Sequence, residues 1–226
     1  MGKMYDRNYR DATQMRVGAG STVMSQVLGL LGFSFVFTAL GGLIGINVGP
    51  AGYSLGLIAS LVFLVALMLL KDHAPLNLTL MYAFATADGL VLGGILEDYV
   101  QAGLGGAIVD AAGTTAVVTL VASVYGITTK CDLRGLSGIL TIGLLALLGA
   151  LIVGLFVQMT ALQLVVAVVG ALLFTAFITV DMQRVARTPA ASGGDAILMA
   201  VSVYLDIVNL FLYLLQLFGM GRRSRG

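Results

Sequence analysis

Seven apolar runs, each long enough to cross a lipid bilayer, divide this chain of 226 residues. A membrane helix needs roughly 20 apolar residues, because the hydrocarbon layer offers the backbone no water to bond. The runs lie at about 23–46, 53–70, 76–96, 107–127, 135–157, 162–185 and 196–218. Turn residues separate them, as at 47–50 and 189–194. The sequence therefore predicts an all-α integral membrane protein with seven transmembrane helices.

Charged residues are scarce and stand mainly outside these runs. They make up 10% of the chain, against about 25% in soluble domains. We expect three parts: a polar N-terminal tail (1–22), a single membrane domain (23–218) and a basic C-terminal tail (219–226). The net charge of +1 gives no reason to expect nucleic acid as a partner. With one cysteine, Cys131, and one histidine, His73, no resident metal or other cofactor is expected.

The basic residues alternate between the two ends of the predicted helices. They occur in the N-terminal tail, in the loops after the second, fourth and sixth runs, and in the C-terminal tail. This asymmetry predicts a cytoplasmic N-terminus. The C-terminal arginines fit only if the last segment re-enters the membrane, but its length favours a full crossing. The other face carries an acidic outer mouth, expected to attract cations: Glu97, Asp98 and Asp110.

The seventh run has the sharpest polar pattern of the membrane segments. Five of its polar side chains are spaced by 4, 3, 4 and 3 residues, which places them on one helical face. They are Ser202, Asp206, Asn209, Tyr213 and Gln216. A polar face in a helix of this length contacts protein or water rather than lipid. It either lines an ion pathway or forms a purely structural hydrogen-bonded seam.

Two further carboxylates lie inside predicted helices, Asp88 in the third and Asp181 in the sixth. Both depths are measured from the cytoplasmic ends of the helices. Asp181 lies roughly 9 Å from the end of helix 6. If helix 7 begins at Asp195 as its N-cap, Asp206 lies roughly 16 Å from the start of helix 7. The offset of about 7 Å allows the two carboxylates to meet. Arg184, one turn beyond Asp181, is an alternative partner for it.

A pair of carboxylates in a site without water is compatible with more than one function. Such a pair titrates as a unit, can sense pH and can offer oxygens transiently to Ca²⁺. The same pair also suits an intramembrane aspartyl protease, although the Gly-x-Gly-Asp context is absent at Asp206. Gly135 to Gly138 resembles a serine-protease motif, but the lone histidine lies in a distant loop. We expect no enzymatic activity.

Small residues at four-residue spacing mark helix contacts. Gly41 and Gly45 lie in the first run, and Gly89 and Gly93 lie in the third. Such pairs let two membrane helices approach closely. Their predicted role is structural.

Three segments carry a resemblance to a known family. "SVYLDIVNLFLYLLQLFG" (202–219) resembles the closing signature of the Bax inhibitor-1 family, also called the transmembrane Bax inhibitor motif family. "ITVDMQRV" (178–185) and "ATADGLVLGGIL" (85–96) are similar to its helix 6 and helix 3 segments. The glycine-rich middle is closest to the bacterial inner-membrane members.

The resemblance implies both a fold and a function. Helix 7 would be central, with helices 1–3 and 4–6 wrapped around it. Asp181 and Asp206 match the aspartate pair that governs a pH-sensitive Ca²⁺ leak in this family. Bacterial relatives are also associated with the modulation of a membrane protease, which makes a non-transporting interaction protein the alternative.

The sequence departs from the family pattern at three places. Asp88 occupies a position that the family usually fills with glutamate. Met182 replaces the usual threonine after the helix 6 aspartate. Relatives that form channels carry an arginine in helix 2 that latches the aspartate pair, whereas residues 53–70 contain no basic residue. Arg184 is the candidate replacement for that latch.

Overall fold

The computed structural model describes residues 2–156 and 159–223, with side chains placed for 23–49, 52–154, 156 and 159–223. The described chain forms helices only, and each contains a stretch apolar enough to span a membrane. They are α1 (Gly2–Gly45), α2 (Gly49–Leu70), α3 (Leu76–Gln101), α4 (Gly105–Thr128), α5 (Leu136–Phe156), α6 (Thr160–Arg187) and α7 (Gly193–Arg223). The predicted all-α architecture of seven spans is confirmed.

Local chemistry sets the ends of the helices that carry the site. α6 ends at Arg187 because Pro189 disfavours helical backbone at the residue before it. α7 begins earlier than expected, and the prediction that Asp195 is its N-cap is wrong. The Ser192 hydroxyl accepts a hydrogen bond from the Asp195 amide (3.1 Å) and donates one to its carboxylate (2.8 Å). Ser192 therefore caps the helix, with Asp195 in the first turn.

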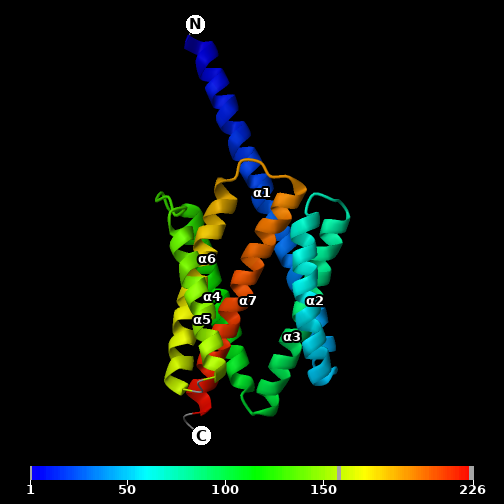
Figure 1. Cartoon of the computed structure of the whole chain (residues 1–226). Coiled ribbons are helices and arrows are strands. Elements are labelled where there is room, and N and C mark those ends of the chain that lie inside the picture. Colours follow the sequence, from blue (N-terminus) through cyan, green and yellow to red (C-terminus); the bar gives the residue numbers. More distant parts are fainter. Residues whose placement is uncertain (1, 157–158, 224–226) are drawn as a thin grey trace.

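The helices form two groups with α7 between them (Figure 1). α3 packs against α1 and α2, and α6 packs against α4 and α5. α7 contacts α6, α4, α1 and α3. In α7, 56% of the most apolar stretch is buried, against at most 39% in the other helices and 6% in α5. The helix that carries the one-sided polar face is thus the most enclosed, as the expected central position requires.

The contact between α1 and α3 depends on glycine. A Cβ on Gly89 would collide with the Thr38 carbonyl oxygen of α1, and a Cβ on Gly93 would collide with that of Gly42. From the other side, Cβ atoms on Gly41 and Gly45 would collide with backbone carbonyls of α3. The predicted packing role of these small residues is confirmed.

α7 runs the whole length of the bundle, so that the chain ends lie at opposite ends of the molecule (Figure 1). The first turns of α1 extend beyond the other helices at the end where the α6–α7 loop lies. At the far end, Arg222 of α7 forms an ion pair with Asp110 of α4 (2.6 Å). The last segment therefore runs the full length of the bundle, as the expected full crossing requires.

Candidate functional site

Asp206 lies in the middle of α7 and is only 7% exposed. Its Oδ2 atom is completely buried and has no hydrogen-bond partner among the described residues. A buried carboxylate oxygen without a partner is costly, because burial removes the water that would otherwise stabilise it. The site therefore favours a proton or a cation at this oxygen.

Asp181 of α6 faces Asp206, as the sequence predicts. The two carboxylates are close enough to interact electrostatically. Asp181 is half-buried, accepts a hydrogen bond from Ser202 and is attracted by Arg184 one turn away. The facing pair thus combines one enclosed carboxylate with one that has a hydroxyl and a cation beside it.

Arg184 lies at the rim of this pair rather than inside it. Its side chain is exposed, and it borders the cavity that Asp181 and Ser137 also line. Among the described residues it is the only cation whose charge acts noticeably on Asp181. The geometry is that of an attraction across the rim, without a direct ion pair.

Asp88 does not join the pair and belongs to a separate buried network. The Tyr204 hydroxyl of α7 donates a hydrogen bond to Asp88 Oδ2 of α3 (2.7 Å) and lies 2.7 Å from Thr38 Oγ1 of α1. Tyr204 is 1% exposed, and its ring contacts Phe35 and Phe84. This tyrosine, absent from the predicted site, ties α7 to both α1 and α3.

The remaining members of the predicted polar face have different environments. The side-chain amide of Asn209 donates to the Leu205 carbonyl of its own helix (2.7 Å). The Tyr213 ring stacks on Phe174 and lies directly over Gly170 of α6. Gln216 is half-buried near the far end of α7. Ser202 and Asp206 therefore meet Asp181, whereas Tyr213 packs against apolar residues of α6.

The far end of the bundle is less acidic than expected. Asp110 is paired with Arg222, so that the C-terminal arginines of α7 offset part of the acidic mouth. The Glu97 carboxylate accepts a hydrogen bond from the Gln101 amide (3.0 Å), and Asp98 is exposed. Asp110 and Glu97 thus each have a side-chain partner, whereas the exposed Asp98 carboxylate has none among the described residues.

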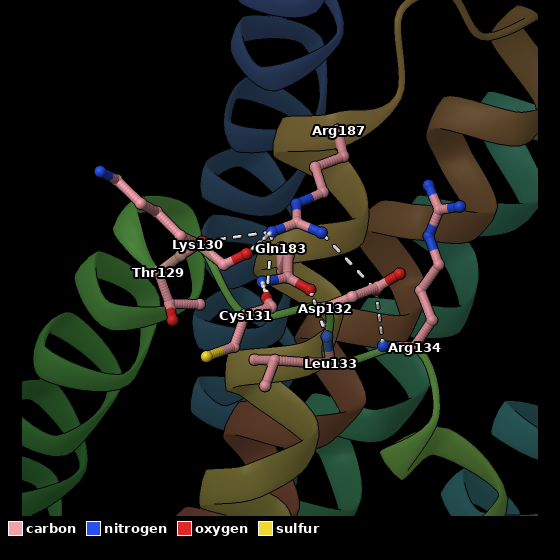
Figure 2. A network of polar contacts seen from close by, with 8 residues as sticks. All are labelled: Thr129, Lys130, Cys131, Asp132, Leu133, Arg134, Gln183 and Arg187. Carbon is pink, nitrogen blue, oxygen red and sulfur yellow. Dashed lines mark hydrogen bonds and ion pairs between the residues drawn. The ribbon is translucent and has the colours of Figure 1, made fainter.

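A polar network fastens the α4–α5 loop to α6 (Figure 2). Gln183 accepts a hydrogen bond from the Leu133 amide (2.8 Å) and donates one to the Cys131 carbonyl (2.9 Å). Arg187 donates to carbonyl oxygens of the same loop and pairs with Asp132 (3.5 Å). The network fixes the end of α6 two residues from Asp181.

The described residues contain no group of three or more histidine, cysteine or carboxylate side chains that could hold a metal ion. Ca²⁺ takes six to eight oxygen ligands, whereas two carboxylates supply four at most. Asp181 and Asp206 alone therefore fall short of a complete Ca²⁺ ligand set.

Known proteins place the chain in a family. The family model described as "Inhibitor of apoptosis-promoting Bax1" matches residues 20–223. "Modulator of FtsH protease YccA" of Escherichia coli K12 is 33% identical over 174 residues, which cover 75% of this chain and 77% of that protein. An uncharacterized protein of Helicobacter pylori J99 is 35% identical over 72% of this chain and 70% of its own length. One of Chlamydia muridarum is 29% identical over 98% of this chain and 99% of its own length. With its seven spans and its match over nearly the whole length, the chain belongs to the Bax inhibitor-1 family of integral membrane proteins.

Proposed function

We propose that this protein is a pH-sensitive leak for Ca²⁺ and similar cations, along a path bordered by α7. The observation that carries the proposal is the buried Oδ2 of Asp206, which lacks a partner and faces a second carboxylate, Asp181. Carboxylates in a membrane interior are costly and typically mark ion or proton pathways. A purely structural seam would satisfy this oxygen with a donor.

The direction of the pH response follows from the charges around the pair. At acid pH a proton shared by Asp181 and Asp206 removes their repulsion, and the two helices stay in contact. At higher pH both carboxylates ionise, repel each other and offer oxygens to a hard cation. The charged neighbour is Arg184 on α6, while Asp88 on α3 is held by Tyr204. The leak is therefore closed in acid and conducts at higher pH.

Arg184 is the candidate replacement for the missing helix 2 arginine, and it attracts Asp181 from the rim of the cavity. Both residues lie on α6, so this attraction does not join α6 to α7. Instead, the Arg184 charge favours the ionised form of Asp181. Arg184→Gln is therefore expected to shift the onset of cation flux to higher pH.

The test is Ca²⁺ flux into liposomes that contain the purified protein, measured at acid and mildly alkaline pH. Asp181→Asn and Asp206→Asn keep the shape of the side chain and imitate its uncharged form. Each is expected to hold the flux at its low acid level throughout, about tenfold below wild type at the higher pH. Asp72→Asn in the exposed α2–α3 loop is the matched control and retains the flux. Flux no greater than in empty liposomes at any pH would refute the leak.

A second function is favoured by one relative. YccA of E. coli is named a modulator of the FtsH protease and, in strain CFT073, an inner membrane protein. We propose, as the alternative, that this chain lies in a bacterial inner membrane with its N-terminus in the cytoplasm and modulates a membrane-bound protease. An intramembrane aspartyl protease would use the same two carboxyls, but membership of a family named for inhibition and modulation supports a non-enzymatic role.

The two functions make different demands on Asp206. A modulator is expected to co-purify with a membrane protease from native membranes and to change the rate at which the protease degrades its substrates. If Asp206→Asn abolishes flux and leaves that rate unchanged, the leak and the modulation are separate activities. If the protein neither associates with a protease nor alters substrate degradation on deletion, the modulator function is excluded.

A further inference from the structure

Two cavities adjoin at Arg184, at the end of the bundle where α6 stops. The larger, about 570 Å³, is lined mainly by apolar side chains, among them Met68, Leu198 and Leu205. The smaller, about 350 Å³, is lined mainly by polar and charged side chains. Arg184 and Thr188 border both. A polar and an apolar compartment thus share one wall.

Arginine dominates the charge of the smaller cavity. Its lining includes Arg134, Arg184 and Arg187, together with the Ser137 hydroxyl and the Asp181 carboxylate. The Arg134 guanidinium makes no ion pair with any residue that the structure describes, and Figure 2 shows it extending apart from that of Arg187. Three positive groups face one negative group, so that the cavity attracts anions.

Arg187 is already committed to the protein, which leaves the other two arginines for a ligand. Its guanidinium donates to the carbonyl oxygens of Thr129 and Cys131 and pairs with Asp132. Arg184 only attracts Asp181 across the rim. Arg134 and Arg184 therefore approach the cavity from α5's N-terminal side and from α6 with donors to spare.

The carboxylate of the larger cavity is neutralised within the protein. Asp195 accepts a hydrogen bond from Lys71 (2.8 Å). This contact raises the pKa of the Lys71 ammonium, which keeps the pair ionised near neutral pH. The apolar compartment thus presents no unpaired negative charge that would repel an anion at Arg184.

We propose that these adjoining cavities bind the phosphate group of an anionic lipid. Arg134 and Arg184 hold the phosphate oxygens with guanidinium N–H donors, a geometry that suits phosphate. The apolar compartment beside Arg184 takes part of an acyl chain. The site lies at the end of α6, where its apolar span stops, on the side that the basic loops assign to the cytoplasm. This binding goes beyond the proposed leak and does not depend on it.

The experiment measures lipid retention by the full-length protein in detergent, using native mass spectrometry with phosphatidylglycerol or phosphatidylcholine added. Arg134→Gln and Arg184→Gln are each expected to lower phosphatidylglycerol binding about tenfold, because each removes a charged phosphate contact. Arg223→Gln is the matched control: it removes one charge at the opposite end of the bundle and retains wild-type binding. Ser137→Asp is a second probe that the fold tolerates, since an acidic residue near the start of α5 favours the helix. It places a negative charge in the cavity and is expected to block binding.

A competition arm identifies the source of the phosphate. Retention of phosphatidylglycerol in the presence of inorganic phosphate at matched ionic strength supports a lipid ligand. Displacement by inorganic phosphate supports the same site with a free anion as its ligand. The proposal is overturned if Arg134→Gln, Arg184→Gln and Ser137→Asp all bind phosphatidylglycerol like wild type, or if Arg223→Gln weakens it equally. Because binding is read directly, this outcome is independent of any flux result.

Discussion

At the scale of single residues, α7 offers two polar groups to different partners. Asp206 faces Asp181 on α6, while Tyr204, two positions earlier, bonds to Asp88 on α3 and lies beside Thr38 on α1. Successive side chains on a helix point about 100° apart, so residues two apart reach different neighbours. One helix thereby carries a carboxylate pair on one side and a tether on the other.

The tether gives a stability prediction. Tyr204→Phe keeps the buried ring but leaves Asp88 Oδ2 without its donor. An unsatisfied buried polar group costs about 1–3 kcal/mol, so the free energy of unfolding is expected to fall by that amount. Thermal unfolding of the purified variant measures the loss. Tyr213→Phe, which preserves the stacking on Phe174, is the control and is expected to change stability less. Equal stability of both variants with wild type would contradict the role assigned to Tyr204.

The carboxylate pair can be predicted from the sequence, whereas the Tyr204 tether cannot, for physical reasons. Asp181 and Asp206 stand out because a carboxylate inside an apolar run is costly and seldom serves packing alone. Tyr204 is an aromatic residue in an apolar run, where packing explains it equally well. The Asp88 partner is visible only once α3 and α7 are placed side by side. The start of α7 is ambiguous in the sequence, because serine and aspartate both favour the N-cap position and Ser192 lies only three residues before Asp195.

At the scale of elements, α1 and α3 make a close backbone contact on one side of the bundle. Their backbones meet at Gly89 and Gly93, where neighbouring carbonyls leave no room for a Cβ. Helices at such short separation gain dispersion energy and weak hydrogen bonds along the contact. The spacing of small residues is legible in the sequence, and it indicated the contact. It did not show which helices would meet, because the partner surface is set by the whole bundle.

A glycine series tests that contact. Gly89→Ala and Gly93→Ala are each expected to destabilise the protein by about 1–3 kcal/mol, since overpacking forces the two backbones apart. Gly29→Ala and Gly113→Ala face open space and serve as controls. These are expected to be neutral or stabilising by up to about 1 kcal/mol, because alanine favours the helix. Thermal unfolding in one detergent compares all four, and equal loss in both groups would refute the close contact.

The loop that joins α4 to α5 is fastened to α6 by the Gln183 amide and the Arg187 guanidinium. Gln183→Leu leaves the Leu133 amide without its acceptor, whereas the Cys131 carbonyl keeps its hydrogen bond from Arg187. The Leu133 amide is then expected to exchange its hydrogen with solvent about tenfold faster or more, because its buried hydrogen bond is lost. Hydrogen exchange of the loop peptide is the measurement. Gln101→Leu, at an exposed position on α3, is the control, and the same exchange rate in both variants would contradict the clamp.

At the scale of the whole molecule, a helix with one polar face is enclosed by two groups of other helices. α5 contributes little burial, whereas α7 is the most buried of the described helices. The number, length and order of the spans could be predicted from the apolar runs alone, because lipid imposes the same constraint on each. The central position of α7 was implied by the family resemblance, and the polar face of this helix fits it. Salt partners such as Arg222 and Asp110 could not be predicted, because they depend on which helix ends come together.

The course of α7 through the bundle predicts where the chain ends. Reporters fused before Met1 and after Gly226 are expected on opposite sides of the membrane, with the N-terminal one in the cytoplasm. Accessibility of each reporter in intact cells measures this. Both reporters on the same side would contradict a crossing α7.

The measurement that tests the account most directly is a double-mutant cycle on the carboxylate pair. Ca²⁺ flux into proteoliposomes at mildly alkaline pH is compared for wild type, Asp181→Asn, Asp206→Asn and the double variant. If the two carboxylates act as one unit, the double variant conducts no less than either single variant, which lies about tenfold below wild type. Single variants that retain wild-type flux, or a double variant whose loss is the product of two independent losses, would contradict the shared site.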